Sequence, residues 1–149
     1  MCESRPFDFS SFSSANMGIA VSGFDYLHAV YKSQDLPADF IFWFAKMFWP
    51  EFKTVDGVIF ISEIFDPARY KELMNDNKYC KNAQFWMNLV EITGIFDGLS
   101  SDQAMIIAKI LANSWSSKLY SETGDKMMIA RAINDEETGE VFVTIGSHG

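Results

Sequence analysis

The sequence is poor in the residues that carry most metal and hydrolytic chemistry. Its 149 residues include two cysteines, Cys2 and Cys80, and two histidines, His28 and His148. Two distant cysteines do not make the disulfide framework of a small secreted domain. The chain has no Cys-x-x-Cys pair and no His-Glu-x-x-His motif, so we expect neither a metal ion nor a cofactor. A hydrolytic triad would depend on His28, beside which the sequence places no nucleophile.

Signals for nucleotides, membranes and secretion are missing as well. There is no Gly-x-Gly-x-x-Gly or Gly-Lys-Ser/Thr motif to hold a phosphate. The longest apolar run, Phe40–Ala45, is far shorter than the ~20 residues of a membrane span. The first residues show neither the charged nor the apolar region of a signal peptide. Together with the scarce cysteines, these features predict a cytoplasmic protein that does not contact membranes.

Positive charge is scarce and scattered. The chain has 12 Lys and Arg against 20 Asp and Glu, a formal net charge of −8, and no basic run. Nucleic-acid binding depends on clustered cations that replace the counterions of phosphates. The charge therefore argues against a nucleic-acid partner and favours a basic protein partner.

The composition is that of a globular protein, with 48% hydrophobic and 21% charged residues. A chain of this mass buries roughly 69% of the surface that its unfolded form exposes. It can therefore form a stable core without disulfide bonds or bound metal ions. We expect one domain over residues 1–149. Residues 1–20, rich in serine and phenylalanine, predict an irregular arm whose phenylalanines pack on the rest of the chain.

Apolar periodicity and capping signals predict about five helices. In the segment 82–96, for example, Phe85, Leu89, Ile92 and Phe96 recur at helical spacing. The predicted helices lie at about 23–33, 37–49, 67–74, 82–96 and 101–120.

Strand signals are fewer. Val58–Ile61 is a short β-branched and aromatic run, and residues 127–133 and 141–145 flank a polar loop at 134–140. The latter pair predicts a C-terminal β-hairpin. Because strands and helices do not alternate, we predict an α+β fold, with about five helices packed on a small, mainly antiparallel sheet.

The hairpin loop is the first candidate site. It contains Asp135, Glu136, Glu137 and Glu140. Residues 122–140 hold six acidic residues against two basic ones, a net charge of −4, which is half of the excess in the chain. Adjacent acidic residues lack the alternating spacing that wraps a calcium ion. We therefore predict that this loop contacts a basic partner.

The aromatic residues are the second candidate feature, at 15% of the chain. Segment 37–49 is apolar almost all round, which predicts a helix covered on every side. A core built from large residues is the favoured interpretation. A homodimer interface comes next, followed by a ligand pocket lined by Trp43 or Trp49.

These observations favour a non-catalytic binding protein that recognises a basic protein through its acidic loop. The alternative is a small-molecule-binding protein or enzyme whose pocket is lined by Trp43 or Trp49. A third hypothesis is self-association, with a homodimer formed through the aromatic helix or through Ile106 and Ile110.

Overall fold

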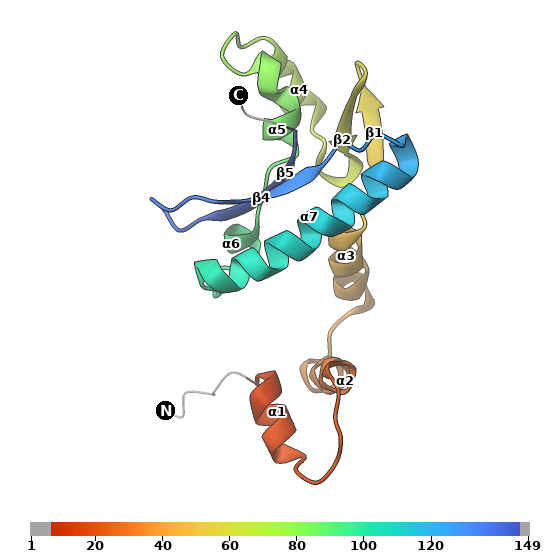
Figure 1. Cartoon of the computed structure of the whole chain (residues 1–149), viewed down its shortest axis with the longest axis vertical. Coiled ribbons are helices and arrows are strands. Elements are labelled where there is room, and N and C mark those ends of the chain that lie inside the picture. The colour runs from red at the N-terminus through yellow and green to blue at the C-terminus, as the bar shows by residue number, and fades with distance from the viewer. Residues whose placement is uncertain (1–6, 147–149) are drawn as a thin grey trace. The chain divides into compact units, whose positions relative to one another are not determined.

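The structure is a computed structural model that describes residues 7–146 (Figure 1). Cys2, the first part of the predicted arm and His148 lie outside the described residues. Contacts between residues divide the chain into two compact units, Met1–Trp43 and Phe44–Gly149. Over the described residues the chain forms seven α-helices, two short 3-10 helices and five strands.

The first unit contains α1 (Phe9–Ala15) and α2 (Gly23–Gln34). The arm predicted to be irregular is therefore helical over Phe9–Ala15. The phenylalanines of this segment pack on one side chain of α2. The ring of Tyr26 lies 5.7 Å from Phe7 and 5.8 Å from both Phe9 and Phe12. Aromatic contacts at these distances hold α1 against α2.

Helix α3 (Ala38–Phe48) differs from its prediction. None of its residues is buried, although we expected the helix to be covered. Phe42 and Trp43 are 63% and 60% exposed. The residues of α3 that pack against the core are Met47 and Phe48, at its C-terminal end. An apolar composition favours burial, but burial also requires neighbouring elements that cover the helix.

The second unit holds two separate antiparallel sheets, where the sequence predicted one. The first is a hairpin, turned at Asp56 and Gly57, both of which have positive φ angles. The second is a three-stranded sheet in the order β3-β5-β4, which includes the predicted C-terminal hairpin. The α+β class is therefore confirmed. The strands are β1 (Phe52–Val55), β2 (Val58–Ile61), β3 (Val90–Glu91), β4 (Ala130–Asn134) and β5 (Val141–Ile145).

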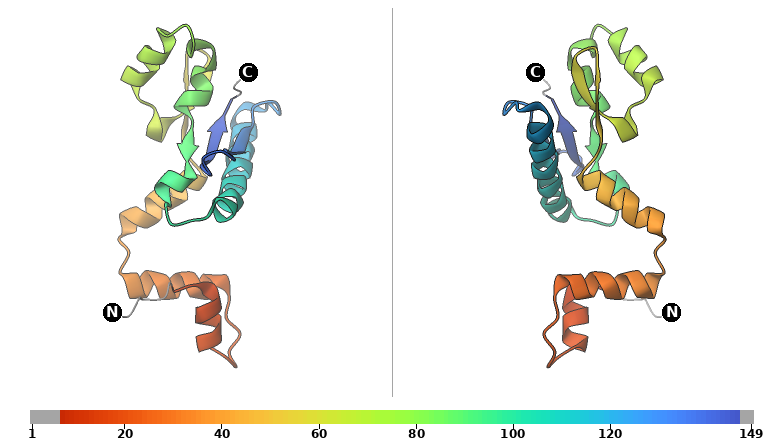
Figure 2. Two further views of the ribbon diagram at one scale, coloured as in Figure 1. Left: turned by 90° about the vertical axis from the view of Figure 1, so that its left-hand side faces the viewer. Right: turned by 90° about the vertical axis from the view of Figure 1, so that its right-hand side faces the viewer.

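Helices lie on both faces of the three-stranded sheet: α7 packs on one side and α5 on the other, with α4 packed against α5 (Figure 2). The long helix α7 begins with a capping box formed by Ser100 and Gln103 and ends at Gly124, whose φ is 70°. The helical elements of this unit are the 3-10 turns Ser62–Ile64 and Cys80–Asn82, α4 (Pro67–Met74), α5 (Ala83–Met87), α6 (Ile92–Ile95) and α7 (Ser101–Thr123).

The core lies between α7 and the sheet. The helix contributes residues at helical spacing, and β5 contributes every second residue, as the alternation of strand side chains requires. Each of these side chains is at most 2% exposed. Their burial fixes the hairpin on α7. The central members are Leu111, Trp115, Leu119, Val141, Val143 and Ile145.

The helix predicted over 82–96 is interrupted. It divides into α5 and α6, and between them Val90–Glu91 pairs with β5. Asn88, which is completely buried, ends α5. Its Oδ1 accepts a hydrogen bond from the Ile61 N–H at 2.9 Å, and its Nδ2 donates to the Ile59 carbonyl at 3.2 Å. Asn88 thereby satisfies the outer backbone groups of β2, which a continuous helix would leave unpaired.

Candidate functional site

The turn of the β4–β5 hairpin is held by its own backbone and side chains. The Asp135 carboxylate accepts hydrogen bonds from the N–H groups of Glu137 at 3.0 Å and Thr138 at 3.4 Å. The Asp135 N–H donates to the Glu140 carbonyl at 2.9 Å, and the Gly139 N–H donates to the Asp135 carbonyl at 2.7 Å. Gly139 has a φ of 76°, which a side chain disfavours. These bonds define one geometry for the turn.

A further hydrogen bond ties the turn to the body of the second unit. The Ser101 hydroxyl, at the start of α7, donates to the Gly139 carbonyl at 2.7 Å. Figure 1 shows the turn projecting beyond the end of α7. The turn is therefore anchored at its base and open at its tip.

The four predicted acidic residues have different roles in this turn. Asp135 and Glu140 are half-buried, and Asp135 is used to shape the turn. Glu136 and Glu137 are exposed, and neither carboxylate forms an ion pair with the residues that the structure describes. The structure thus brings the four residues together but leaves the two at the tip free to meet cations from outside the chain.

The two predicted tryptophans differ in position: Trp43 lies in the middle of the apolar segment and Trp49 at its C-terminal end. Trp43 is within α3, and Trp49 follows its last residue. The ring of Trp49 lies 5.7 Å from the Nζ of Lys118, a cation–π contact that already uses one of its faces. Lys118 is buried, donates to the Pro50 carbonyl, and lies 3.8 Å from Glu51 and 3.7 Å from Glu122. That Trp43 or Trp49 binds a ligand stays a prediction.

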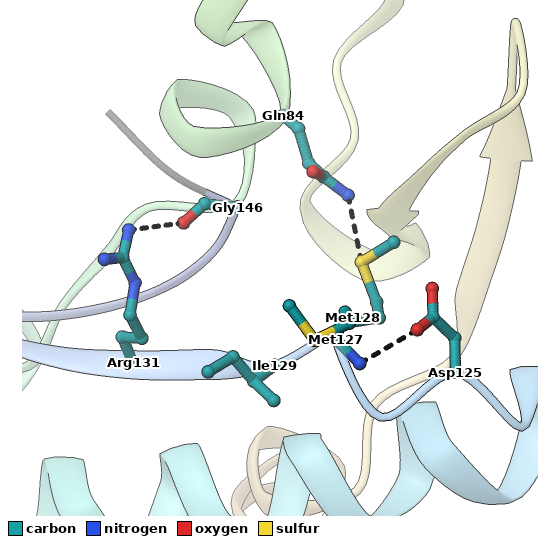
Figure 3. A pocket seen from close by; sticks show the side chains of 7 residues that line it. All are labelled: Gln84, Asp125, Met127, Met128, Ile129, Arg131 and Gly146. Carbon is teal, nitrogen blue, oxygen red and sulfur yellow. Dashed lines mark hydrogen bonds between the residues drawn. The ribbon is translucent and has the colours of Figure 1, made fainter. Parts of the chain in front are cut away.

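A pocket that the sequence did not indicate lies beside the start of β4 (Figure 3). Its volume is about 400 Å³, and at one end Arg131 donates from Nη2 to the Gly146 carbonyl at 2.7 Å. At the other end, the Asp125 carboxylate accepts the Met127 N–H at 2.8 Å. No local pattern predicted this pocket, because its lining comes from three separate segments. It is lined by Gln84, Asp125, Met127, Met128, Ile129, Arg131 and Gly146.

A second pocket lies on the α7 side of the same loop and has a volume of about 490 Å³. Tyr120 and Ile129 in its wall are about half exposed. Its lining is mostly apolar in character, which suits a hydrophobic side chain. The lining residues are Ser116, Ser117, Tyr120, Asp125, Lys126, Met128 and Ile129.

Residues 7–146 offer neither a metal-ligand cluster nor a membrane-spanning helix. No group of three or more His, Cys, Asp or Glu side chains is placed to hold a metal ion. Among these same residues, no helix has both the length and the apolar character needed to cross a bilayer.

Comparisons with known proteins do not identify a relative. No family model matches the chain, and neither a curated protein nor a solved structure is similar to it.

Proposed function

We infer that this chain is a binding protein and that it captures a protein partner with a basic surface through the tip of the β4–β5 hairpin. One observation carries the proposal: Glu136 and Glu137 project from an anchored turn with carboxylates that are unpaired within the described residues. A preformed turn does not lose conformational freedom when it binds, so little of the interaction energy is spent on ordering. Complementary charge speeds the encounter and selects the partner.

The overall charge supports the same inference. With a net charge of −8, the chain repels other acidic molecules over a distance of several ångströms. A basic partner is attracted to the whole surface and meets the tip, where the acidic residues are densest. Such attraction weakens as salt screens the charges, which gives the proposal a clear experimental signature.

The test reverses charge at the tip. We expect Glu136→Lys/Glu137→Lys to lose capture of proteins with basic isoelectric points from an extract of the native host, as measured by mass spectrometry at low and high salt. Because the two side chains make no internal ion pair, the melting temperature should stay unchanged. A matched control is Glu72→Lys/Asp97→Lys, which reverses two other exposed acidic residues and brings the charge to the same −4.

The comparison between the two variants decides the outcome. Loss of capture in the tip variant alone supports the proposal. Equal loss in both variants assigns the effect to net charge, and unchanged capture in both shows that the tip is only a solvated loop; either result contradicts the proposal.

A further inference from the structure

One edge of the three-stranded sheet is open. In the order β3-β5-β4, strand β4 has β5 on one side and, among residues 7–146, no strand on the other. Edge strands carry unpaired N–H and C=O groups that another chain can use. The hydrogen bonds of this strand show which groups those are.

Antiparallel pairing makes residues of β4 alternate between bonding to β5 and facing away from it. The Asp135 N–H donates to the Glu140 carbonyl, so in β4 the backbone N–H and C=O groups of odd-numbered residues point toward β5. The backbone groups of even-numbered residues point away from it. Ala130 faces outward, since its N–H donates to the Ser116 Oγ at 2.9 Å and its carbonyl accepts from the same hydroxyl at 3.4 Å. The outward groups of Ala132 and Asn134 have no such partner within residues 7–146.

In contrast to β4, the outer backbone groups of strand β2 are hydrogen-bonded by side chains. There the Ile61 N–H and the Ile59 carbonyl are bonded by Asn88, and Gln84 donates to the same carbonyl at 3.2 Å. No side chain of the described residues does this for Ala132 or Asn134. The open stretch of β4 is therefore a local feature of this strand.

The apolar pocket of about 490 Å³ lies at one end of this edge. Ser116 locates the pocket at the Ala130 end of β4, because it lines the pocket and also bonds to the outward backbone groups of Ala130. The acidic tip with Glu136 and Glu137 lies at the other end. Along this edge the acidic tip comes first, followed by Asn134 and Ala132 with unpaired outward backbone groups. Next come Ala130, whose backbone groups bond to Ser116, and then the apolar pocket.

We propose that the partner docks by adding an extended segment to the outer edge of β4, with a basic residue at the hairpin tip and an apolar residue in the pocket bounded by Tyr120 and Ile129. This proposal rests on the proposed function, because it names how the basic partner is held. Strand addition is an established recognition mode in which backbone bonds give affinity and side-chain pockets give specificity. Ile129 and Glu136 flank β4 seven positions apart, which is at most about 23 Å of extended chain. The basic and apolar residues of the segment therefore lie about six or seven positions apart.

The probe is a displayed library of random peptides about a dozen residues long, selected on the full chain. We expect the selected peptides to carry Lys or Arg and a large apolar residue at the stated separation. The wild-type protein gives the first readout, by hydrogen exchange. On adding a selected peptide, exchange of the Ala132 and Asn134 amides slows, whereas the Ile133 amide, which already faces β5, changes little.

Substitutions give the second readout. Ala132→Pro removes the outward N–H and leaves the ladder to β5 intact, so affinity for the peptide should fall by about tenfold or more. The matched control is Ala132→Gly, which keeps that N–H. Should the proline variant fail to fold, Ile129→Asp tests the pocket instead. Its control is Ile95→Asp, at an exposed isoleucine of α6, which should bind the peptide like the wild type.

The results separate this proposal from the proposed function. If the tip reversal abolishes capture of basic proteins but Ala132→Pro and Ile129→Asp do not, the function stands and strand addition is wrong. A selection without the expected spacing, or without protection of Ala132, also overturns it. A doubled native mass with Ala132 protected before any peptide is added assigns the edge to a second copy and overturns it too.

Discussion

Helices α7 and α3 show how little apolar content alone decides. Seven residues of α7 are buried, and they recur along one face against the sheet. Helix α3 is the more apolar of the two, with five consecutive large apolar residues from Phe40 to Phe44, yet none of its residues is buried. The difference lies in the neighbouring elements: one face of α7 packs against β4 and β5, whereas α3 reaches the core at Met47 and Phe48.

The largest expected contrast comes from truncating one apolar side chain in each helix. Leu111→Ala, at a fully buried position of α7, should lower the free energy of unfolding by about 3 kcal/mol through lost burial and a residual cavity. Phe42→Ala, at a position that is 63% exposed, should lower it by less than about 1 kcal/mol. Urea denaturation monitored by circular dichroism measures both. Similar losses would show that Phe42 is covered in solution.

The next contrast tests the joint between the two helices. The Ser114 hydroxyl of α7 donates to the Phe48 carbonyl, and the Trp115 Nε1 donates to the Met47 carbonyl at 2.7 Å. Ser114→Ala leaves the Phe48 carbonyl without this donor, which should cost about 1 kcal/mol.

Hydrogen exchange locates that loss. The Trp49 N–H, bonded to the Ala45 carbonyl at 3.1 Å, should exchange faster in Ser114→Ala than in the wild type. A matched substitution is Ser117→Ala, on the exposed side of α7. Faster exchange in that variant too would mean that the effect is not specific to the joint.

A smaller loss of stability is expected from removing an N-cap. Helices α7 and α2 both begin with a capping box. Ser100 accepts from the Gln103 N–H at 3.2 Å, and Ser22 accepts from the Asp25 N–H at 3.2 Å. Ser100→Ala should lower global stability by about 1 kcal/mol, because α7 carries the core. Ser22→Ala should fray the first turn of α2 without moving the main unfolding transition. Equal shifts in melting temperature would contradict this difference.

The smallest effect is a response to acid that the two caps do not share. In α2 the backbone N–H of Ser22 lowers the pKa of the Asp25 carboxyl below its ordinary value of 3.8. A carboxyl whose pKa is lowered on folding stabilises the folded form above its ordinary pKa. That stabilisation is lost as the pH falls through the lowered value. In α7 the corresponding residue, Gln103, does not titrate.

Amide chemical shifts measure this response. Below about pH 4, the Ser22 amide resonance should move as its bond to the Asp25 carboxylate weakens, while that of Ser100 stays constant. Asp25→Asn should abolish the movement. A Ser22 shift that persists in this variant would assign the titration to another group.

The acidic loop was predictable from the sequence, whereas most of the surface around it was not. Asp135 and Gly139 are turn residues between two β-rich runs, so neighbouring positions suffice to place Glu136 and Glu137 at a hairpin tip. Both pockets beside β4 use the loop that follows α7; one combines it with residues of α7, the other with Gln84 of α5 and Gly146. No local pattern indicates that those segments meet. The open edge of β4 depends on strand order, which a hairpin signal does not specify.

The segment 82–96 shows the same limit for the fold. Its apolar spacing fits a helix over the whole stretch, and α5 and α6 do form within it. The break is imposed by distant partners: Asn88 bonds to β2, and Val90 pairs with Val143 of β5. Satisfying buried backbone groups and completing the sheet outweighs continued helical periodicity.

Local sequence patterns were enough to predict the α+β class, the C-terminal hairpin and its acidic turn. Each of these depends on hydrogen bonds or side-chain alternation among residues a few positions apart. Long-range packing and strand pairing fix the burial of α7 but not of α3, the division of the strands into two sheets, and the bonding of β2 by Asn88, while within residues 7–146 no strand pairs with the outer side of β4. These outcomes depend on which distant surfaces meet, since burial and backbone pairing require a partner that no local pattern contains.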